Sequence, residues 1–168
     1  MEGHEGFGEF VAARSPGLLR TGWLLTGDYQ LAEDLLQTAL IRVWPHWRRV
    51  VGGGSPEAYV RRVMVRTYAT WWRRRWRAEV PYGQLPDRPA QGDPHALTGL
   101  RAAVLAALAE LPPKQRAVLV LRYYEDLPED EIARILDCSP GTVKSQAAKA
   151  RAKLRPLLHA WTGEETTL

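Results

Sequence analysis

Cysteine is almost absent from this sequence, since its 168 residues include a single one, Cys138. One cysteine excludes an internal disulfide and is typical of a reducing compartment. No segment approaches the roughly 20 apolar residues that span a bilayer. The N-terminus, MEGHEGFGEF, also lacks the basic start and apolar run of a signal peptide. We therefore expect a cytoplasmic protein.

Signatures of enzymes and of β-structure are missing as well. The sequence has no Gly-rich phosphate loop and no paired carboxylates in a plausible cleft, and its histidines, His4, His46, His95 and His159, are scattered. No segment shows the alternating pattern of a strand. These absences predict an all-α protein that is not an enzyme and needs no cofactor or metal.

Positive charge is present but unevenly placed. The net charge is only +4. Residues 61–77 nevertheless contain seven arginines and no acid, and residues 140–155 contain five basic residues and no acid. Acidic residues gather instead in residues 28–34 and 125–137. Two separate basic stripes in a small chain indicate two contacts with a polyanion.

The first half of the chain predicts several helices. Residues 7–25 form a helix that we expect to be interrupted or bent near Pro16, because proline opposes helix continuation. A second amphipathic helix follows Asp28 and bends or ends at Pro45. After a glycine-rich loop, Ser55 is placed to cap a helix that begins at Pro56 and extends to about residue 78.

Composition then divides the chain. Residues 80–98 carry four of the twelve prolines and are predicted to be a linker. It separates a domain of residues 1–79 from a domain of residues 99–158, and a polar tail, 159–168, follows. The second domain is predicted to contain four helices, at 99–110, 112–125, 129–136 and 140–158.

The last two of these helices have the pattern of a helix-turn-helix. Ile132, Ile135 and Leu136 form an inner face, and Ser139 can cap the next helix, whose first residue is Pro140. In that helix Val143, Ala147, Ala150 and Leu154 face inward, which places Lys144, Ser145, Ala148 and Lys149 on the outer face near its N-terminus. A recognition helix meets the major groove with this part. A plain helical hairpin with a solvated basic face is the alternative.

The segment TWWRRRWR, residues 70–77, combines large rings with fixed charge. On the helix from Pro56, Arg62, Arg66, Thr70, Arg73 and Arg77 form one stripe, with Trp72 and Trp76 beside it and Trp71 toward the core. Exposed rings beside cations suit melted nucleic acid. Tryptophans packed under arginine stems are an equally weighted alternative.

A small acidic and polar patch lies on the helix after Asp28. Glu33, Asp34 and Gln37 share its outer face. The patch suits docking of a basic partner, although acidic residues early in a helix also favour its dipole.

Together these features resemble the extracytoplasmic-function sigma factors of bacterial RNA polymerase. The likeness rests on LLTGDYQLAEDLLQTALIRVW, on SPEAYVRRVMVRTYATWWRRR and on ALAELPPKQRAVLVLRYYEDLPEDEIARILDCSPGTVKSQAAKARAKLR. It implies a factor that binds core polymerase, recognises minus-ten and minus-thirty-five promoter elements and initiates transcription of a specific regulon.

The resemblance also assigns residues. Core polymerase, through its beta-prime coiled coil and beta flap, is the implied partner, and the coiled coil would contact Glu33, Asp34 and Gln37. Residues implied at the minus-ten element are Arg62, Arg66, Thr70, Arg73 and Arg74, with the loop 48–56 helping to hold a flipped base. Those implied at the minus-thirty-five element are Thr142, Lys144, Ser145, Gln146 and Lys149. An anti-sigma factor that clamps the domains around the linker is a further possible partner.

Departures from the family pattern concern promoter sequence. Many members have Asn where this chain has Arg66, Asp where it has Thr70, and Arg where it has Gln146.

The alternative function is a dimeric regulator that binds duplex operators without polymerase. It accounts for the helix-turn-helix but leaves the arginine–tryptophan helix and the acidic patch without a role.

Overall fold

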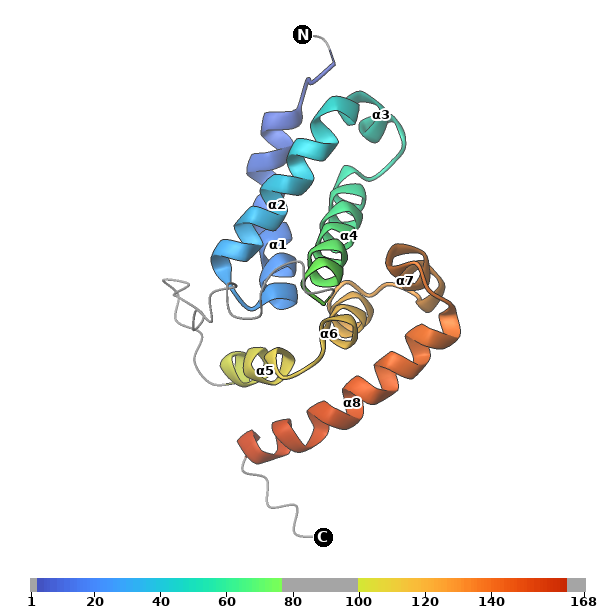
Figure 1. Ribbon diagram of the computed structural model, residues 1–168. Coiled ribbons are helices and arrows are strands. Elements are labelled where there is room, and N and C mark those ends of the chain that lie inside the picture. The colour runs from blue at the N-terminus through green and yellow to red at the C-terminus, as the bar shows by residue number, and fades with distance from the viewer. Residues whose placement is uncertain (1–2, 77–99, 163–168) are drawn as a thin grey trace. The chain divides into compact units, whose positions relative to one another are not determined.

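The computed structural model describes residues 3–76 and 100–162 (Figure 1). Every regular element in these two ranges is helical, so the predicted all-α class is confirmed. The chain divides into two units, residues 1–91 and 92–168, whose boundary falls inside the segment predicted as a linker. That segment itself, residues 80–98, lies wholly outside the described residues. Each unit is described by itself below.

Three long helices build the first unit, together with two short elements. The α1 helix packs on α2, and α4 packs on both (Figure 1). The bounds are α1 (Phe7–Thr26), α2 (Tyr29–Val43), the 3₁₀ turn η1 (Trp44–His46), α3 (Trp47–Gly52) and α4 (Pro56–Trp76). As predicted, α2 ends just before Pro45, and α4 begins at Pro56.

The connection between α1 and α2 is set by local capping. Gly27 ends α1 in the left-handed conformation, with φ 70°. The Asp28 carboxylate then accepts hydrogen bonds from the backbone N–H groups of Gln30, at 2.8 Å, and Leu31, at 3.2 Å. These bonds satisfy two of the donors that a helix start leaves open. The antiparallel α1–α2 pair therefore follows from a two-residue junction, Gly27 and Asp28.

Residues 7–25 were expected to be interrupted or bent near Pro16; the interruption is wrong, because α1 continues through this residue, and the bend stays a prediction. An interior proline removes a hydrogen bond to the carbonyl four residues earlier and costs roughly 3 kcal/mol. Both Pro16 and Ala12, which carries that carbonyl, are exposed, so water can take the place of the missing donor. Beyond Pro16, Leu18 and Leu25 are buried, and their packing outweighs the local cost.

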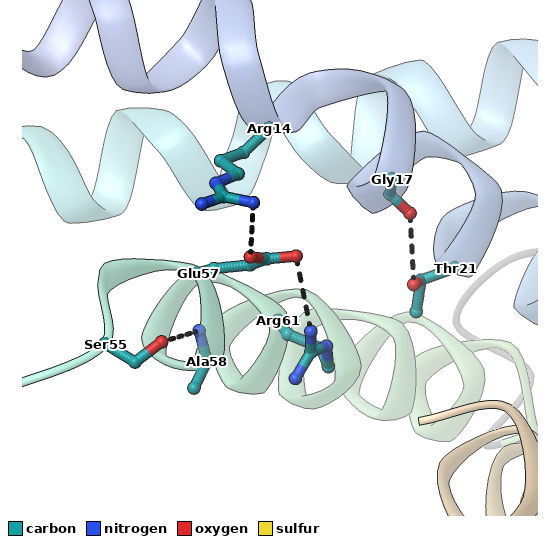
Figure 2. A network of polar contacts seen from close by, with 7 residues as sticks. All are labelled: Arg14, Gly17, Thr21, Ser55, Glu57, Ala58 and Arg61. Carbon is teal, nitrogen blue, oxygen red and sulfur yellow. Dashed lines mark hydrogen bonds and ion pairs between the residues drawn. The ribbon is translucent and has the colours of Figure 1, made fainter. Parts of the chain in front are cut away.

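Glu57, in the first turn of α4, joins that helix to α1. Its carboxylate lies 3.6 Å from Nη1 of Arg14 and 3.5 Å from Nη2 of Arg61 (Figure 2). Next to it, Oγ of Ser55 accepts a hydrogen bond from the N–H of Ala58 at 3.2 Å (Figure 2). The predicted cap is confirmed, and it fixes the direction in which α4 leaves the preceding loop.

The second unit is organised around its last helix. The α8 helix packs against α5, α6 and α7 (Figure 1). The bounds are α5 (Leu100–Ala109), α6 (Pro113–Leu119), the π-helical turn η2 (Val120–Tyr124), α7 (Glu129–Leu136) and α8 (Pro140–Thr162). The π-helical turn within the predicted helix 112–125 was not anticipated, and α8 extends to Thr162, into the segment predicted as a tail.

A tight turn connects α7 and α8. Asp137 adopts a left-handed conformation with φ 55°, and the N–H of Cys138 donates to the carbonyl of Ala133 at 3.0 Å. Oγ of Ser139 then accepts from the N–H of Thr142 at 3.1 Å, which confirms the predicted cap. The inner face predicted for α7 is buried, at Ile132, Ile135 and Leu136. The two helices thus form a helix-turn-helix.

Candidate nucleic-acid interface

The first turns of α8 present the residues predicted to read duplex DNA. Lys144, Ser145 and Lys149 are exposed, whereas Thr142 and Gln146 are half-buried. The opposite face of α8 is held in the core by Val143, Ala147 and Ala150, all buried as predicted, with Leu154 half-buried. Because the apolar positions recur every three or four residues, burying them turns the polar positions outward.

Thr142 takes part in the cap of α8. Its hydroxyl lies 2.9 Å from the hydroxyl of Ser139, whose oxygen also receives the Thr142 N–H. The side chain is therefore fixed at the helix start. An N-terminus with open backbone donors and an ordered hydroxyl suits an anionic ligand such as a phosphate.

Lys144 is engaged by a carboxylate from the neighbouring helix. Its Nζ lies 3.7 Å from Oε2 of Glu129, the first residue of α7. Both residues line a shallow surface pocket, whose other lining residues are Arg122, Asp130 and Pro140. This pocket brings together the start of α7, the start of α8 and the π-helical turn. Glu129 was not among the predicted site residues.

The α4 helix carries the second predicted interface. Arg66, Arg73 and Arg74 are exposed, while Arg62 and Thr70 are half-buried. The Thr70 hydroxyl donates to the carbonyl of Arg66 at 2.9 Å, so its oxygen can still accept a hydrogen bond from a ligand. Buried Val60, Met64 and Thr67 hold the opposite face in the core.

The tryptophans of TWWRRRWR divide differently from the prediction. Trp71, expected in the core, is half-buried, and so is Trp72, expected beside the arginines. The side chains of Arg75 and Trp76 and the whole of Arg77 lie outside the described residues. Two rings next to the exposed Arg73 and Arg74 are therefore accessible in part, which fits packing under arginine stems as well as stacking with a base.

The segment predicted as a loop at 48–56 is mostly helical. Residues 48–52 belong to α3, which leaves residues 53–55 as the connection to α4. An aromatic cluster anchors this region: the Trp47 ring meets Phe7 edge-on at 5.1 Å between centroids, and its Nε1 donates to the carbonyl of Glu5 at 2.9 Å. The flanks of the short glycine loop are thereby fixed to the N-terminal segment.

The acidic patch on α2 is exposed throughout. Glu33, Asp34 and Gln37 all face solvent, as predicted. Sequence reasoning missed Ile41, which lies one turn beyond Gln37 on the same face and is 72% exposed. Its signal was present in the sequence, because the spacing of 33, 37 and 41 repeats every four residues. Ile41 therefore adds one exposed apolar side chain to the acidic and polar patch.

Two further kinds of site were sought in the described ranges. Neither range contains a helix long and apolar enough to cross a membrane. Residues 3–76 and 100–162 also contain no group of three or more metal-ligating side chains placed to hold an ion.

Comparisons with known proteins now connect these features. Residues 10–78 match the Sigma-70 region 2 family, and residues 101–154 match the Sigma-70, region 4 family. The RNA polymerase sigma-E factor of Streptomyces coelicolor is 43% identical over 92% of this chain and 86% of its own. The ECF RNA polymerase sigma factor SigE of Mycolicibacterium smegmatis is 32% identical over 93% of this chain and 63% of its own.

A solved structure of another sigma factor has a similar fold. The sigma factor RpoE from Bartonella quintana, crystallised in complex with the anti-sigma factor NepR, superposes with a TM-score of 0.66 at 25% identity. The match covers 90% of this chain and 96% of that one. The chain belongs to the extracytoplasmic-function subfamily of the sigma-70 family of RNA polymerase sigma factors.

Proposed function

We propose that this sigma factor divides promoter recognition between the two interfaces described above. The α8 helix reads the minus-thirty-five duplex through Lys144, Ser145, Gln146 and Lys149, with Thr142 at its start. The observation that carries the proposal is that the helix-turn-helix turns these polar side chains outward while burying the opposite face of α8. A recognition helix in the major groove needs this orientation.

The α4 helix serves the minus-ten element. Arg66, Arg73 and Arg74 are exposed cations that can neutralise phosphates, and Arg62 and Thr70 lie along the same helix. Separating strands costs a few kcal/mol for each unstacked base, and stacking on an aromatic ring returns roughly 1–3 kcal/mol. Melting is thus offset by binding, and the protein supplies no chemistry of its own. The short glycine loop lies at the N-terminal end of the same helix and would hold a flipped base.

Core polymerase docks on the outer face of α2. Glu33, Asp34 and Gln37 offer carboxylates and an amide to a basic coiled coil of the beta-prime subunit, and Ile41 adds an apolar contact. The second unit contacts the beta flap. An anti-sigma factor is a further partner, which is supported by the complex of the related RpoE with NepR. Such a factor would act on the protein in the cytoplasm and use the segment 80–98 between domains 1–79 and 99–158.

Run-off transcription tests the proposal. Purified protein is added to core bacterial RNA polymerase on a pool of promoter fragments, with core polymerase alone as the control. Transcripts that begin at discrete sites only when the protein is present are expected, and their upstream sequences give both promoter elements. Binding to duplex fragments without any programmed transcription would instead favour the operator-binding regulator.

A further inference from the structure

A carboxylate occupies the DNA-facing surface of the second unit beside a cation assigned to DNA. Glu129 begins α7, Lys144 lies in the second turn of α8, and their charged groups are 3.7 Å apart. The Lys144 side chain is 70% exposed and that of Glu129 is 30% exposed. The ion pair therefore forms at the rim of the helix-turn-helix, in reach of an approaching duplex.

Neighbouring charges do not share this arrangement. Asp130, the next residue of α7, pairs with Arg134 of its own helix at 3.3 Å. Lys149, the other lysine assigned to DNA, forms no ion pair within the described residues. The Glu129–Lys144 ion pair therefore differs from these neighbours, because it joins a carboxylate of α7 to a cation of the recognition helix.

We infer that Glu129 restrains sequence-independent DNA binding by competing with phosphate for Lys144. This inference rests on the proposed role of α8 at the minus-thirty-five duplex. An ammonium group that already has a carboxylate partner brings less net positive charge to a phosphate. When DNA binds, Lys144 either exchanges Glu129 for a phosphate or leaves the Glu129 carboxylate close to the anionic backbone. Both outcomes reduce the free energy that the contact between Lys144 and a phosphate contributes to DNA binding.

The restraint is modest and reversible. Exposed ion pairs are weak and are screened by salt, so exchange of one partner for another is easy. A phosphate contact carries no sequence information, so Glu129 lowers affinity for cognate and unrelated duplexes by a similar factor. Selectivity for the promoter then depends on the base contacts of Ser145 and Gln146.

The test compares Glu129→Gln with the wild type as full-length protein bound to core polymerase. Binding is measured over a salt series on a promoter fragment found by run-off transcription, and on the same fragment with its minus-thirty-five element scrambled. Glu129→Gln is expected to tighten binding to both fragments about threefold at low salt, since one competing exposed charge is removed. The slope of log affinity against log salt should steepen by up to about 0.9, the contribution of one phosphate.

Matched variants separate this effect from a general loss of negative charge. Asp130→Asn removes one charge from the same turn without touching the Lys144 pair, so its effect should be clearly smaller. In a Lys144→Ala background, Glu129→Gln should change little. Equal effects of Glu129→Gln and Asp130→Asn, an effect that persists without Lys144, weaker binding by Glu129→Gln, or a gain confined to the cognate fragment would each overturn the inference.

Lys149→Ala distinguishes this failure from failure of the proposed function. If Lys149→Ala weakens binding while Glu129→Gln changes nothing, α8 binds the duplex and only the inference about Glu129 fails. If neither substitution has an effect, the placement of α8 on DNA fails, and the inference falls with it.

Discussion

The two helices that we assign to the promoter, α4 and α8, begin with the same capping signal. The chain segments that precede them differ. Ser55-Pro56 starts α4 and Ser139-Pro140 starts α8, and each serine hydroxyl accepts a backbone N–H three residues later, at 3.2 Å and 3.1 Å. Serine at the cap and proline at the first helical position are an efficient local start signal. The same signal therefore starts both helices proposed to contact the promoter.

The segments that precede Ser55 and Ser139 differ in amino-acid composition. Three glycines, residues 52–54, precede Ser55, and Gly54 has φ 124°, which side chains with a Cβ rarely adopt. Before Ser139, the turn at Asp137 is held by a Cys138 N–H bonded to Ala133. The N–H of Gly53 is likewise bonded, to the carbonyl of Arg49 at 3.1 Å, so both segments are held by the backbone. They differ in the space that they leave: a Cβ at Gly52 or Gly54 would meet no atom within 4 Å, which suits the proposed admission of an unstacked base.

The two units also use their acidic residues differently. Glu57 pairs with Arg14 and Arg61 and links α4 to α1, whereas Glu129 pairs with a lysine that faces outward. The chemistry is the same in both cases. Arg14 and Lys144 are both largely exposed, at 58% and 70%. The proposed difference between the pairs is therefore the direction of the cation, toward a neighbouring helix for Arg14 and toward the proposed DNA surface for Lys144.

Core substitutions test most strongly whether the two units are independent. Ile132→Ala removes a fully buried side chain from the second unit and is expected to cost about 2–5 kcal/mol of its stability. Leu35→Ala, also fully buried, is the matched change in the first unit. Amide hydrogen exchange should show lost protection in the unit that carries the substitution. Lost protection in both units from either change would contradict the division.

Arg66→Ala and Lys149→Ala test whether α4 acts on melted DNA and α8 on duplex DNA. Loss of a hydrogen bond to a charged group costs about tenfold in the step that uses it. Arg66→Ala should impair promoter opening, followed by permanganate reactivity, more than initial binding. Lys149→Ala should weaken initial binding and lower its salt slope by about one. Equal loss at both steps for Arg66→Ala, or an unchanged salt slope for Lys149→Ala, would refute the assignments.

Cap substitutions compare the two helix starts directly. Ser55→Ala and Ser139→Ala should each cost about 1 kcal/mol, and glycine at the same positions only a few tenths. In a domain of this size, 1 kcal/mol lowers the melting temperature by roughly 4–8 °C. Thermal unfolding of the four variants measures the effect. Alanine variants as stable as the wild type would mean that the serine hydroxyls do not cap these helices.

Local features were predicted well because their causes are close in sequence. Both serine caps and the buried face of α7 depend on residues within a few positions of one another. The interruption predicted as one outcome at Pro16 does not occur, because the packing of Leu18 and Leu25 outweighs the local cost of an interior proline. The loop expected at 48–56 failed similarly, since α3 is stabilised by the burial of Trp47 and Val50.

Long-range pairs could not be predicted from sequence. Glu129 and Lys144 meet only because the turn at residues 137–139 sets the angle between α7 and α8. Ile41 was readable from its four-residue spacing, but its exposure depends on which faces of α2 the other helices cover. The contacts of Glu33, Arg66 and Lys149 with polymerase and DNA stay predictions, because they depend on partners.

The smallest effect is expected for Glu57→Gln, the counterpart of Glu129→Gln in the first unit. Glu57 lies 3.6 Å from Arg14 and 3.5 Å from Arg61, with its side chain 31% exposed. Partly exposed pairs of this kind contribute less than about 1 kcal/mol. Because Arg14 and Arg61 are not among the residues assigned to the promoter, the salt slope of promoter binding should not change. A slope that steepens as much as in Glu129→Gln would show that net charge, and not the direction of the paired cation, governs binding. The contrast between the two glutamates would then disappear.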